Sequence, residues 1–315
     1  MTTAMVSITE SYGARIGWIR PDDAVGLRRQ DVPDDVNLVR VRLDRRDDEQ
    51  WEQLRRAGFV VKPGYVHWVS EVGESEQSYA ARLAGKARRG VAYARRRVDD
   101  DGVTISCEPL TPDSFDGFHS LYALQIAGMR WGWNFAAVKR EEVLDDIDRY
   151  IIVSGRRGEE LLGACIVRLE PENSFARARF TAYAPEQRSQ GLSRVLLWSA
   201  LNEARARGFA RFSLGVDPNL YGHIAEPGLI RFKARLGFVP VPSHHLEPEL
   251  GGYHAEAVVG ADFFADPCVA LEYRDSTSAY GVAVITHRRD IDLAEYTTTV
   301  APHGVRLAPS PLQKG

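Results

Sequence analysis

Apolar positions in this chain either alternate with polar ones, as in a strand, or recur at helical spacing. Residues 36–44 alternate apolar and charged side chains, which predicts a half-buried strand. Residues 47–59 carry apolar side chains at helical spacing, and residues 59–69 predict two strands separated at Pro63 and Gly64. The first 35 residues show no period that predicts an element.

From residue 103 onward, the pattern predicts a regular succession of strands and helices. Strands are expected at residues 103–109, 150–154, 161–169, 175–183, 211–215 and 238–241, with helices at residues 111–128, 140–149, 192–207 and 227–236. Residues 268–287 predict a hairpin with its turn at 275–278, and residues 308–315 are expected to be disordered. This succession is typical of a mixed α/β fold.

Residues 77–98 form the most basic segment, with seven basic side chains and no acidic one. On a helical projection one arc holds Leu83, Ala87, Val91, Ala94 and Val98, and the other holds Arg82, Lys86, Arg89, Tyr93, Arg96 and Arg97. This arrangement predicts one amphipathic helix, which ends in the turn at residues 99–102. Its basic face is either an ordinary solvated surface or a phosphate-binding surface for RNA or a coenzyme, on which Tyr93 would stack against a base.

Composition limits the class of protein without naming an activity. The 315 residues suggest about two domains, and 40 Lys and Arg against 43 Asp and Glu give a net charge of −3. RNA binding would therefore depend on the basic segment alone. The three cysteines Cys107, Cys165 and Cys268 form no CxxC pair, which argues against a disulfide framework and a thiolate zinc site. Neither a signal peptide nor a membrane span is evident, so we expect a cytoplasmic protein without membrane contact.

A loop between the strand at 175–183 and the helix at 192–207 is the strongest candidate for ligand binding. Unpaired backbone N–H groups at a helix N-terminus and the helix dipole favour an anionic phosphate, and a glycine lets the ligand come close. The alternative is an ordinary helix cap. The candidate cofactor-binding residues are Gln187, Arg188, Ser189, Gln190, Gly191, Leu192 and Ser193.

This loop resembles the pyrophosphate loop of the GNAT superfamily of N-acyltransferases, which reads Arg/Gln-x-x-Gly-x-Gly/Ala. Arg188 and Gly191 match, whereas Ser193 departs from the last position. Leu236-Gly237-Phe238 is similar to the LGF sequence that precedes the last paired strand of the family. The resemblance covers residues 103–242 and implies an acyl-CoA donor and an amine acceptor, which is a small molecule or a peptide.

A second resemblance concerns residues 228–237, which are similar to the G-L-x-x-F-K-x-x-F/L-G pattern of the Fem-type aminoacyl transferases. Lys233 stands where GNAT enzymes commonly carry a tyrosine. Fem-type proteins have two GNAT-like halves and use aminoacyl-tRNA, and the basic segment is similar to part of their first half. We therefore expect an α/β protein with two GNAT-like domains, each a mixed, mostly antiparallel sheet flanked by helices. The boundaries expected are 1–102, 103–242, and 243–315 for strands that complete a sheet.

Candidate catalytic residues follow the strand at 211–215. Lys233 would be a fixed positive charge near developing negative charge, although a solvated helix lysine is the alternative. His223 would be the general base, with Asp217 and Tyr221 beside it, and the alternative is a loop built by Asp-Pro-Asn turn chemistry. A backbone N–H near residues 183–185 would hold the oxyanion.

The acceptor pocket would be lined by Trp131, Trp133 and Asn134, together with Tyr183, and the alternative for the tryptophans is core packing. His244, His245 and His254 have no metal-ligand spacing, so no metal is expected. Nucleophilic catalysis by serine or cysteine is poorly supported.

The leading functional hypothesis is an acyl-CoA-dependent N-acyltransferase. The first alternative is an aminoacyl-tRNA-dependent transferase with tRNA as partner, and the second is a GNAT scaffold without catalysis.

Overall fold

The computed structural model describes residues 5–44, 46–187, 191–274 and 280–308. The chain divides into two compact units, which we call unit 1 and unit 2. Unit 1 comprises Met1–His67, Val216–Ala234 and Pro240–Gly315, and unit 2 comprises Trp68–Gly215 and Arg235–Val239. The division therefore differs from the expected boundaries at 102 and 242, and the assignment of functional domains stays a prediction.

Unit 1 contains a five-stranded sheet in the order β1-β2-β3-β12-β4. Its strands are β1 (Met5–Ser11), β2 (Ala14–Ile19), β3 (Leu38–Leu43), β12 (Tyr253–Val258) and β4 (Val60–Pro63). Strand β12 pairs antiparallel with both β3 and β4, so a strand from the end of the chain lies between two strands from its beginning.

A second, three-stranded sheet of unit 1 has the order β13-β14-β15, formed by Cys268–Tyr273, Tyr280–Ile285 and Val305–Leu307. Strands β13 and β14 pair antiparallel, which confirms the predicted hairpin. The predicted turn residues 275–278 and the tail from residue 309 lie outside the described residues. Helices α1 (Pro21–Ala24) and α2 (Asp48–Arg56) also belong to this unit, and α2 buries Trp51 and Leu54.

A third sheet has seven strands in the order β11-β5-β10-β9-β8-β7-β6. The strands are β5 (Tyr65–Glu71), β6 (Thr104–Pro109), β7 (Tyr150–Arg157), β8 (Glu160–Glu170), β9 (Phe175–Tyr183), β10 (Arg211–Pro218) and β11 (Val239–Pro242). Strands β6 to β9 pair antiparallel, and β9 pairs parallel with β10. The division between the units falls within β5, β10 and β11.

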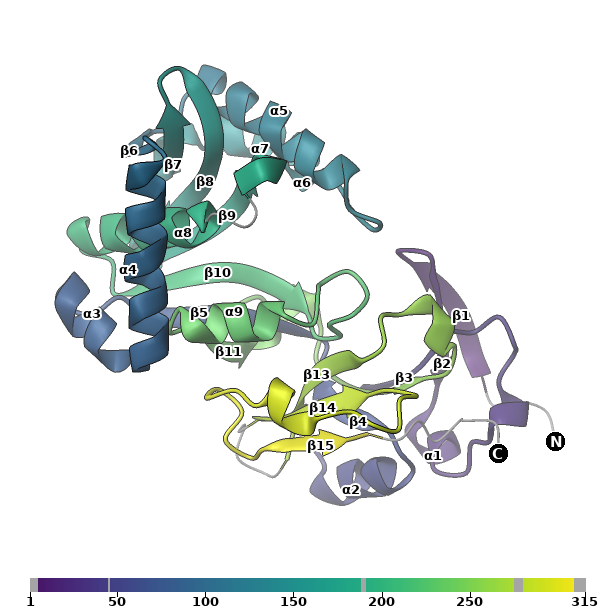
Figure 1. The fold of residues 1–315 in the computed structure, drawn as a ribbon. Helices are drawn as coiled ribbons and strands as arrows, with labels where there is room; N and C mark the ends of the chain where they lie inside the picture. Colours follow the sequence, from purple (N-terminus) through teal and green to yellow (C-terminus); the bar gives the residue numbers. More distant parts are fainter. Residues whose placement is uncertain (1–4, 45, 188–190, 275–279, 309–315) are drawn as a thin grey trace. The chain divides into compact units, whose positions relative to one another are not determined.

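The helices that follow β5 in the chain are shown in Figure 1. They are α3 (Glu76–Arg82), α4 (Gly85–Asp100), α5 (Pro112–Ala127), α6 (Phe135–Val138), α7 (Arg140–Asp145), α8 (Leu192–Ala206) and α9 (Leu229–Arg235). Short 3-10 helices lie at Arg29–Asp31, Ile147–Arg149, Pro171–Asn173, Pro185–Gln187, Ser243–His245, Pro248–Leu250, Ala261–Phe263 and Leu293–Tyr296.

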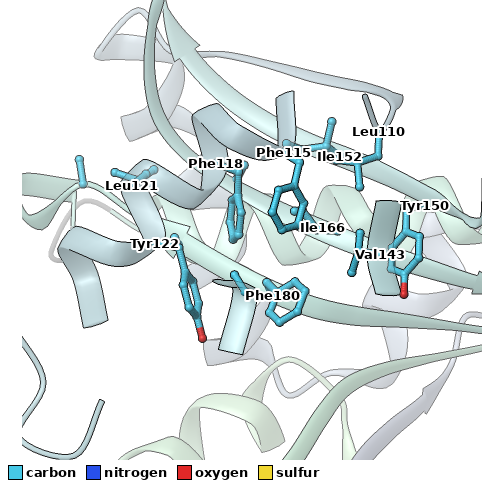
Figure 2. Close-up of a cluster of buried hydrophobic side chains, with 14 residues drawn as sticks. Leu110, Phe115, Phe118, Leu121, Tyr122, Val143, Tyr150, Ile152, Ile166 and Phe180 are labelled. Carbon is cyan, nitrogen blue, oxygen red and sulfur yellow. The ribbon is translucent and has the colours of Figure 1, made fainter. Parts of the chain in front are cut away.

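Helix α5 packs on one face of the unit 2 sheet. Phe115 and Phe118 lie among Ile152, Ile166 and Phe180 from three neighbouring strands, as Figure 2 shows. Thr111 accepts a hydrogen bond from the N–H of Ser114 and Pro112 occupies the first turn, which confirms the predicted helix start. Helix α8 covers the opposite face of this sheet. Its Leu192 contacts Gly155 and Gly163, and the residues adjacent to these glycines in the strands point to the α5 side, so the glycines themselves face α8.

One prediction for the first hundred residues is wrong, and one segment without a prediction proves to be structured. The basic segment forms two helices, because Leu83 has extended backbone (φ −80°, ψ 147°) and ends α3 before α4 begins. The first 35 residues, which show no clear period, contain the β1–β2 hairpin and α1. The mixed α/β fold class is confirmed, since the described sheets are mostly antiparallel and are flanked by helices.

Candidate functional site

The parallel strands β9 and β10 separate early, which leaves their far ends unpaired with each other. Only Arg211–Ser213 of β10 pairs with Phe175–Arg177 of β9. Strand β9 continues to Tyr183 and leads through the 3-10 helix Pro185–Gln187 toward α8. The candidate loop therefore starts where the sheet opens, at the carboxyl end of a strand, which is where α/β sheets commonly bind ligands.

The N-terminus of α8 has the geometry of an open anion site. Gly191 is its N-cap residue with φ 88°, a left-handed conformation that favours glycine, and no side chain of the described residues caps the helix. The N–H groups of Arg194 and Val195 donate to the Gly191 carbonyl, at 3.0 and 3.2 Å. The first N–H groups of such a helix point outward and carry the positive end of the dipole.

The residues predicted to bind the cofactor differ in their burial. Gln187 is 5% exposed, and its Oε1 has no hydrogen-bond partner among the described residues. Ser193 is half-buried. Leu192 was predicted to contact cofactor, but its side chain is buried against Gly155 and Gly163, so that only its backbone can serve a ligand. Arg188, Ser189 and Gln190 lie outside the described residues.

Helix α4 packs directly on this N-terminus. A Cβ at Gly191 would lie 2.9 Å from the Cβ of Ala94, so only glycine fits beside α4. Arg194 of α8 donates to the carbonyl of Gly90 at 3.3 Å. The two regions that the sequence singled out, the loop and the basic segment, therefore meet within unit 2.

The solvent-facing side of α4 is basic. Lys86, Arg89 and Arg96 are exposed, as is Tyr93, whose exposed fraction is 55%. Arg88, which the projection did not select, is also exposed. The buried side of α4 holds Val91, Ala94 and Val98, as predicted. These side chains leave a phosphate-sized ligand access to several cations along one helix.

Two members of the predicted basic stripe do not join this face as expected. Arg82 belongs to α3, where its guanidinium stacks on Tyr79 at 4.7 Å and donates to the carbonyl of Glu71. Arg97 is half-buried and donates to the Tyr93 hydroxyl at 3.5 Å. The break at Leu83 is the physical reason for the first difference, because it turns α3 away from the axis of α4.

In unit 1, three of the four candidate catalytic residues come together. The Lys233 ammonium lies 2.7 Å from Asp217 Oδ1, and the Tyr221 hydroxyl donates to Asp217 Oδ2 at 3.1 Å. Lys233 is only 6% exposed, so the alternative of a solvated helix lysine is wrong. Helix α9 and the end of β10 thus hold a buried cation against a buried carboxylate, with a phenol completing the cluster.

His223, the predicted general base, lies elsewhere in unit 1. Its ring packs edge-on against Phe263 and Phe264, with centroids 5.4 and 5.2 Å away. Its Nε2 lies 3.0 Å from the Tyr12 carbonyl oxygen, which makes Nε2 a donor in the neutral ring.

The backbone N–H groups near the end of β9, which were predicted to bind the oxyanion, already donate hydrogen bonds within the protein. The N–H of Tyr183 donates to the side-chain oxygen of Gln125 at 3.1 Å, and the N–H of Ala184 donates to the Leu162 carbonyl at 2.8 Å. Pro185 has no N–H. In this conformation, therefore, none of the three supplies a free donor to an oxyanion, and that prediction is wrong.

The predicted acceptor residues form a partly exposed aromatic segment. Trp133 is 52% exposed and stacks on Phe135 at 5.4 Å, which excludes core packing for this residue. Trp131 is half-buried, with Arg130 over its ring at 5.0 Å. Asn134 caps α6 by accepting from the N–H of Ala137, and its Nδ2 lies 3.0 Å from Nε2 of His119. Asn134 thus has a structural task that the sequence did not reveal.

The described cysteines are poor nucleophiles. Burial raises the pKa of the Cys107 thiol to about 11 and the pKa of Cys165 and Cys268 to about 12, so the thiolate is scarce at neutral pH. Among the residues with described positions, no three His, Cys, Asp or Glu side chains gather as metal ligands would. Within the same residues, no helix has the length and apolar character of a membrane span.

Sequence reasoning missed two buried polar groups of unit 1. Asn219 donates to the carbonyls of Pro63 and Leu271, at 3.0 and 2.7 Å, and accepts from the N–H of Leu271. Lys62 and Glu256 form a buried ion pair. A lysine inside the apolar run at residues 59–61 is the one signal that pointed to the second group.

Residues 118–238 match the family model described as the acetyltransferase (GNAT) family. The solved structures with a similar fold include the C-terminal domain of a putative lysylphosphatidylglycerol synthetase from Agrobacterium fabrum, at 12% identity, 79% coverage of both chains and a TM-score of 0.44. FemX is similar at 10% identity, 81% coverage of this chain, 84% of that chain and a TM-score of 0.45. L-PGS from Bacillus licheniformis is similar at 11% identity, 79% coverage of both chains and a TM-score of 0.42. A comparison with curated proteins finds no significant match.

The matched segment contains the elements described above, from α5 through the opened pair β9 and β10 and the N-terminus of α8 to the start of β11. The resemblance stated from Gly191 and the LGF sequence is thereby confirmed. Residues 118–238 are thus similar to the GNAT acetyltransferase family, and the chain is an acyltransferase.

Proposed function

We propose that the chain forms amide bonds by transferring an aminoacyl group from aminoacyl-tRNA to the amine of a small molecule or peptide. One observation carries the choice of donor, namely the contact between Gly191 and Ala94, which packs the N-terminus of α8 on the apolar side of the helix whose exposed side is basic. A donor bound to this exposed cationic surface of α4, or to the helix end, must be an anion.

The length of this surface favours a nucleic acid. Helix α4 has 16 residues and spans about 24 Å. A coenzyme pyrophosphate occupies a small part of that length, whereas an RNA backbone presents a phosphate at each nucleotide along it. Exposed Tyr93 offers a stacking surface among the cations.

The reaction needs no group beyond those of the two substrates. The acceptor nitrogen loses a proton and attacks the ester carbonyl, the C–N bond forms, and the C–O bond to the tRNA ribose breaks. The ribose oxygen takes up a proton, so atoms and charge balance. We assign Lys233, held by Asp217, the role of a fixed positive charge for negative charge that develops during this step.

Acyl-CoA is the second candidate donor. The specific observation in its favour is the open N-terminus of α8 with its left-handed Gly191, which suits a pyrophosphate. In that case the basic face of α4 would be a solvated surface without a partner.

The test measures retention of bulk tRNA on the purified chain over a range of salt concentrations. The charge-reversal variant Lys86→Glu/Arg89→Glu/Arg96→Glu is expected to bind more weakly, with the slope of log affinity against log salt reduced by about 2–3. Arg28→Glu, an exposed reversal on unit 1, controls for net charge and should change the slope little.

Acetyl-CoA is added to the same protein in a thermal unfolding measurement. Salt-sensitive tRNA retention without a thermal shift supports aminoacyl-tRNA as donor. A rise of the melting temperature with acetyl-CoA and no tRNA retention contradicts the proposal in favour of acyl-CoA. If neither ligand binds, both donor assignments are wrong.

A further inference from the structure

Unit 1 contains a small pocket of about 60 Å3 that the proposed function does not use. Its lining comes from distant parts of the sequence, including Arg40, Lys62, Gly64, Asn219, His223 and His254. Its volume matches about two water molecules, or one carboxylate or phosphate group. Polar and apolar side chains contribute about equally to the whole lining, and its charged members are Arg40 and Lys62.

A buried ion cluster forms one wall. Glu256 Oε1 lies 2.6 Å from Arg40 Nε, and Glu256 Oε2 lies 2.6 Å from Lys62 Nζ. Both Lys62 and Glu256 are about 2% exposed, and Glu256 is the single carboxylate in ion-pair contact with either cation in the described part of the chain. Two cations therefore share one anion, and the cluster carries one net positive charge.

A net charge inside a protein is costly unless something compensates it. Arg40 also stacks on Trp18, at 5.3 Å from the ring centroid, which disperses part of its charge. Burial lowers the pKa of Lys62, although the neighbouring Glu256 opposes that change. An anion in the pocket would supply the missing negative charge.

His254 adds a polar atom without a partner. The residue is 9% exposed, and its Nδ1 has no hydrogen-bond partner in the described part of the chain. This nitrogen lies against Gly64, where an added Cβ would be 2.8 Å from it. Both residues line the pocket, so the missing side chain at position 64 keeps room beside the orphan nitrogen.

We infer that this pocket binds the carboxylate or phosphate group of a small ligand, held by Arg40 and Lys62 and hydrogen-bonded by the ring of His254. The surplus cation, the orphan nitrogen and the size of the pocket point independently to the same ligand chemistry. Anion binding at this pocket does not depend on the proposed function.

The experiment follows the ring signals of His254 by NMR while sodium acetate or sodium phosphate is added at constant ionic strength. Acetate represents a carboxylate ligand and inorganic phosphate a phosphate ligand. Glu256→Gln keeps the shape of the side chain but removes the internal anion, so it is expected to tighten binding about tenfold. Glu272→Gln is the matched control, because Glu272 is another buried glutamate of unit 1 with two arginine partners.

Gly64→Ala tests the same pocket without changing charge. The added methyl would press on His254 and is expected to weaken binding of either anion. If Glu256→Gln does not fold, Gly64→Ala still tests whether the pocket binds an anion. A response to acetate alone assigns a carboxylate ligand, and a response to phosphate alone assigns a phosphate ligand.

The inference is overturned if millimolar acetate and phosphate leave the His254 signals unchanged in the wild type and in Glu256→Gln. It is also overturned if exposed His287 responds as strongly, or if Gly64→Ala binds as well as the wild type. Because the measurement requires neither tRNA nor turnover, its failure leaves the proposed donor untouched. Failure of tRNA binding likewise leaves the pocket untouched.

Discussion

A buried ammonium group needs a buried partner, and Lys233 has one in Asp217. The pair is shielded on both sides, with side-chain exposures of 8% and 10%. Removing one member of such a pair leaves the other charge uncompensated in a medium of low dielectric. The lysine therefore has a structural role whatever it does in catalysis, and a test of its chemistry must separate the two.

Lys233→Ala is expected to lower the free energy of unfolding by about 3–5 kcal/mol, because Asp217 then stays buried without its partner. Turnover should fall as well. Unfolding in urea and the rate of amide formation are measured on the same preparation, so that loss of activity can be compared with loss of folded protein.

The double variant Lys233→Met/Asp217→Asn separates the two effects. It removes both charges while keeping similar volumes, and the Tyr221 hydroxyl can still donate to the amide oxygen at position 217. Stability should return toward the wild-type value while turnover stays low. Recovery of turnover together with stability would show that the ammonium group only holds the fold together.

His254 predicts how the stability of the chain depends on pH. Burial lowers its pKa from 6.5 to about 4, and Arg40, Lys62 and Arg42 act in the same direction, against Glu256. The folded chain keeps the ring neutral while the unfolded chain takes up a proton below pH 6.5. The stabilisation is therefore complete above pH 6.5 and is lost as the pH falls toward 4, by about 3 kcal/mol.

The measurement compares the free energy of unfolding of the wild type and His254→Asn across this pH range. The variant should lose less stability on acidification than the wild type. Glu256, whose pKa is lowered to about 2 despite its burial because of Arg40 and Lys62, contributes its own loss mainly below pH 4.5 in both proteins. Equal slopes above pH 4.5 would mean that His254 is already protonated in the folded chain.

At the scale of elements, the N-terminus of α8 packs against the apolar side of α4 at Ala94. Gly191→Ala should lower the free energy of unfolding by about 2 kcal/mol, since φ 88° disfavours a side chain and the new Cβ would overlap Ala94. Chemical denaturation measures the stability, and donor retention measures the effect on binding.

Gly102→Ala is the matched control for this variant. Gly102 has φ 67°, but no atom lies within 4 Å of an added Cβ. Gly102→Ala should therefore show the loss of unfolding free energy that comes from the left-handed backbone, without the loss that comes from a steric contact. Adding Ala94→Gly to Gly191→Ala should recover only the contact part. If both glycine variants lose the same stability, α4 does not constrain the start of α8.

Most elements after residue 103 were predictable because each has a strong local signal. The start of α5, for example, combines a threonine cap with a proline in the first turn. The break between α3 and α4 was not predictable, because Leu83 and Ala84 fit a continuous amphipathic pattern. The position of strand β12 was not predicted. Two of its buried side chains, His254 and Glu256, are polar, so the sequence lacks the apolar pattern of a buried strand.

At the scale of the whole molecule, the residues of a site come from distant parts of the chain. Asp217 and Lys233 were both candidates, the first from its place after a strand and the second from a resemblance, but their ion pair was not predicted. The ion pair of Lys62 with Glu256 could not be predicted, since it depends on the pairing of β4 with β12. Pairing between segments so far apart is set by the packing of the whole unit and leaves no local signal.

The place of β12 between β3 and β4 also concerns the growing polypeptide. When the ribosome has made β4, the partner of both strands lies nearly two hundred residues ahead in the message. Strands β3 and β4 must wait with open edges until Tyr253–Val258 has been translated. A message cut short before Tyr253 would therefore yield a product whose beginning, and not merely its end, is left unfinished.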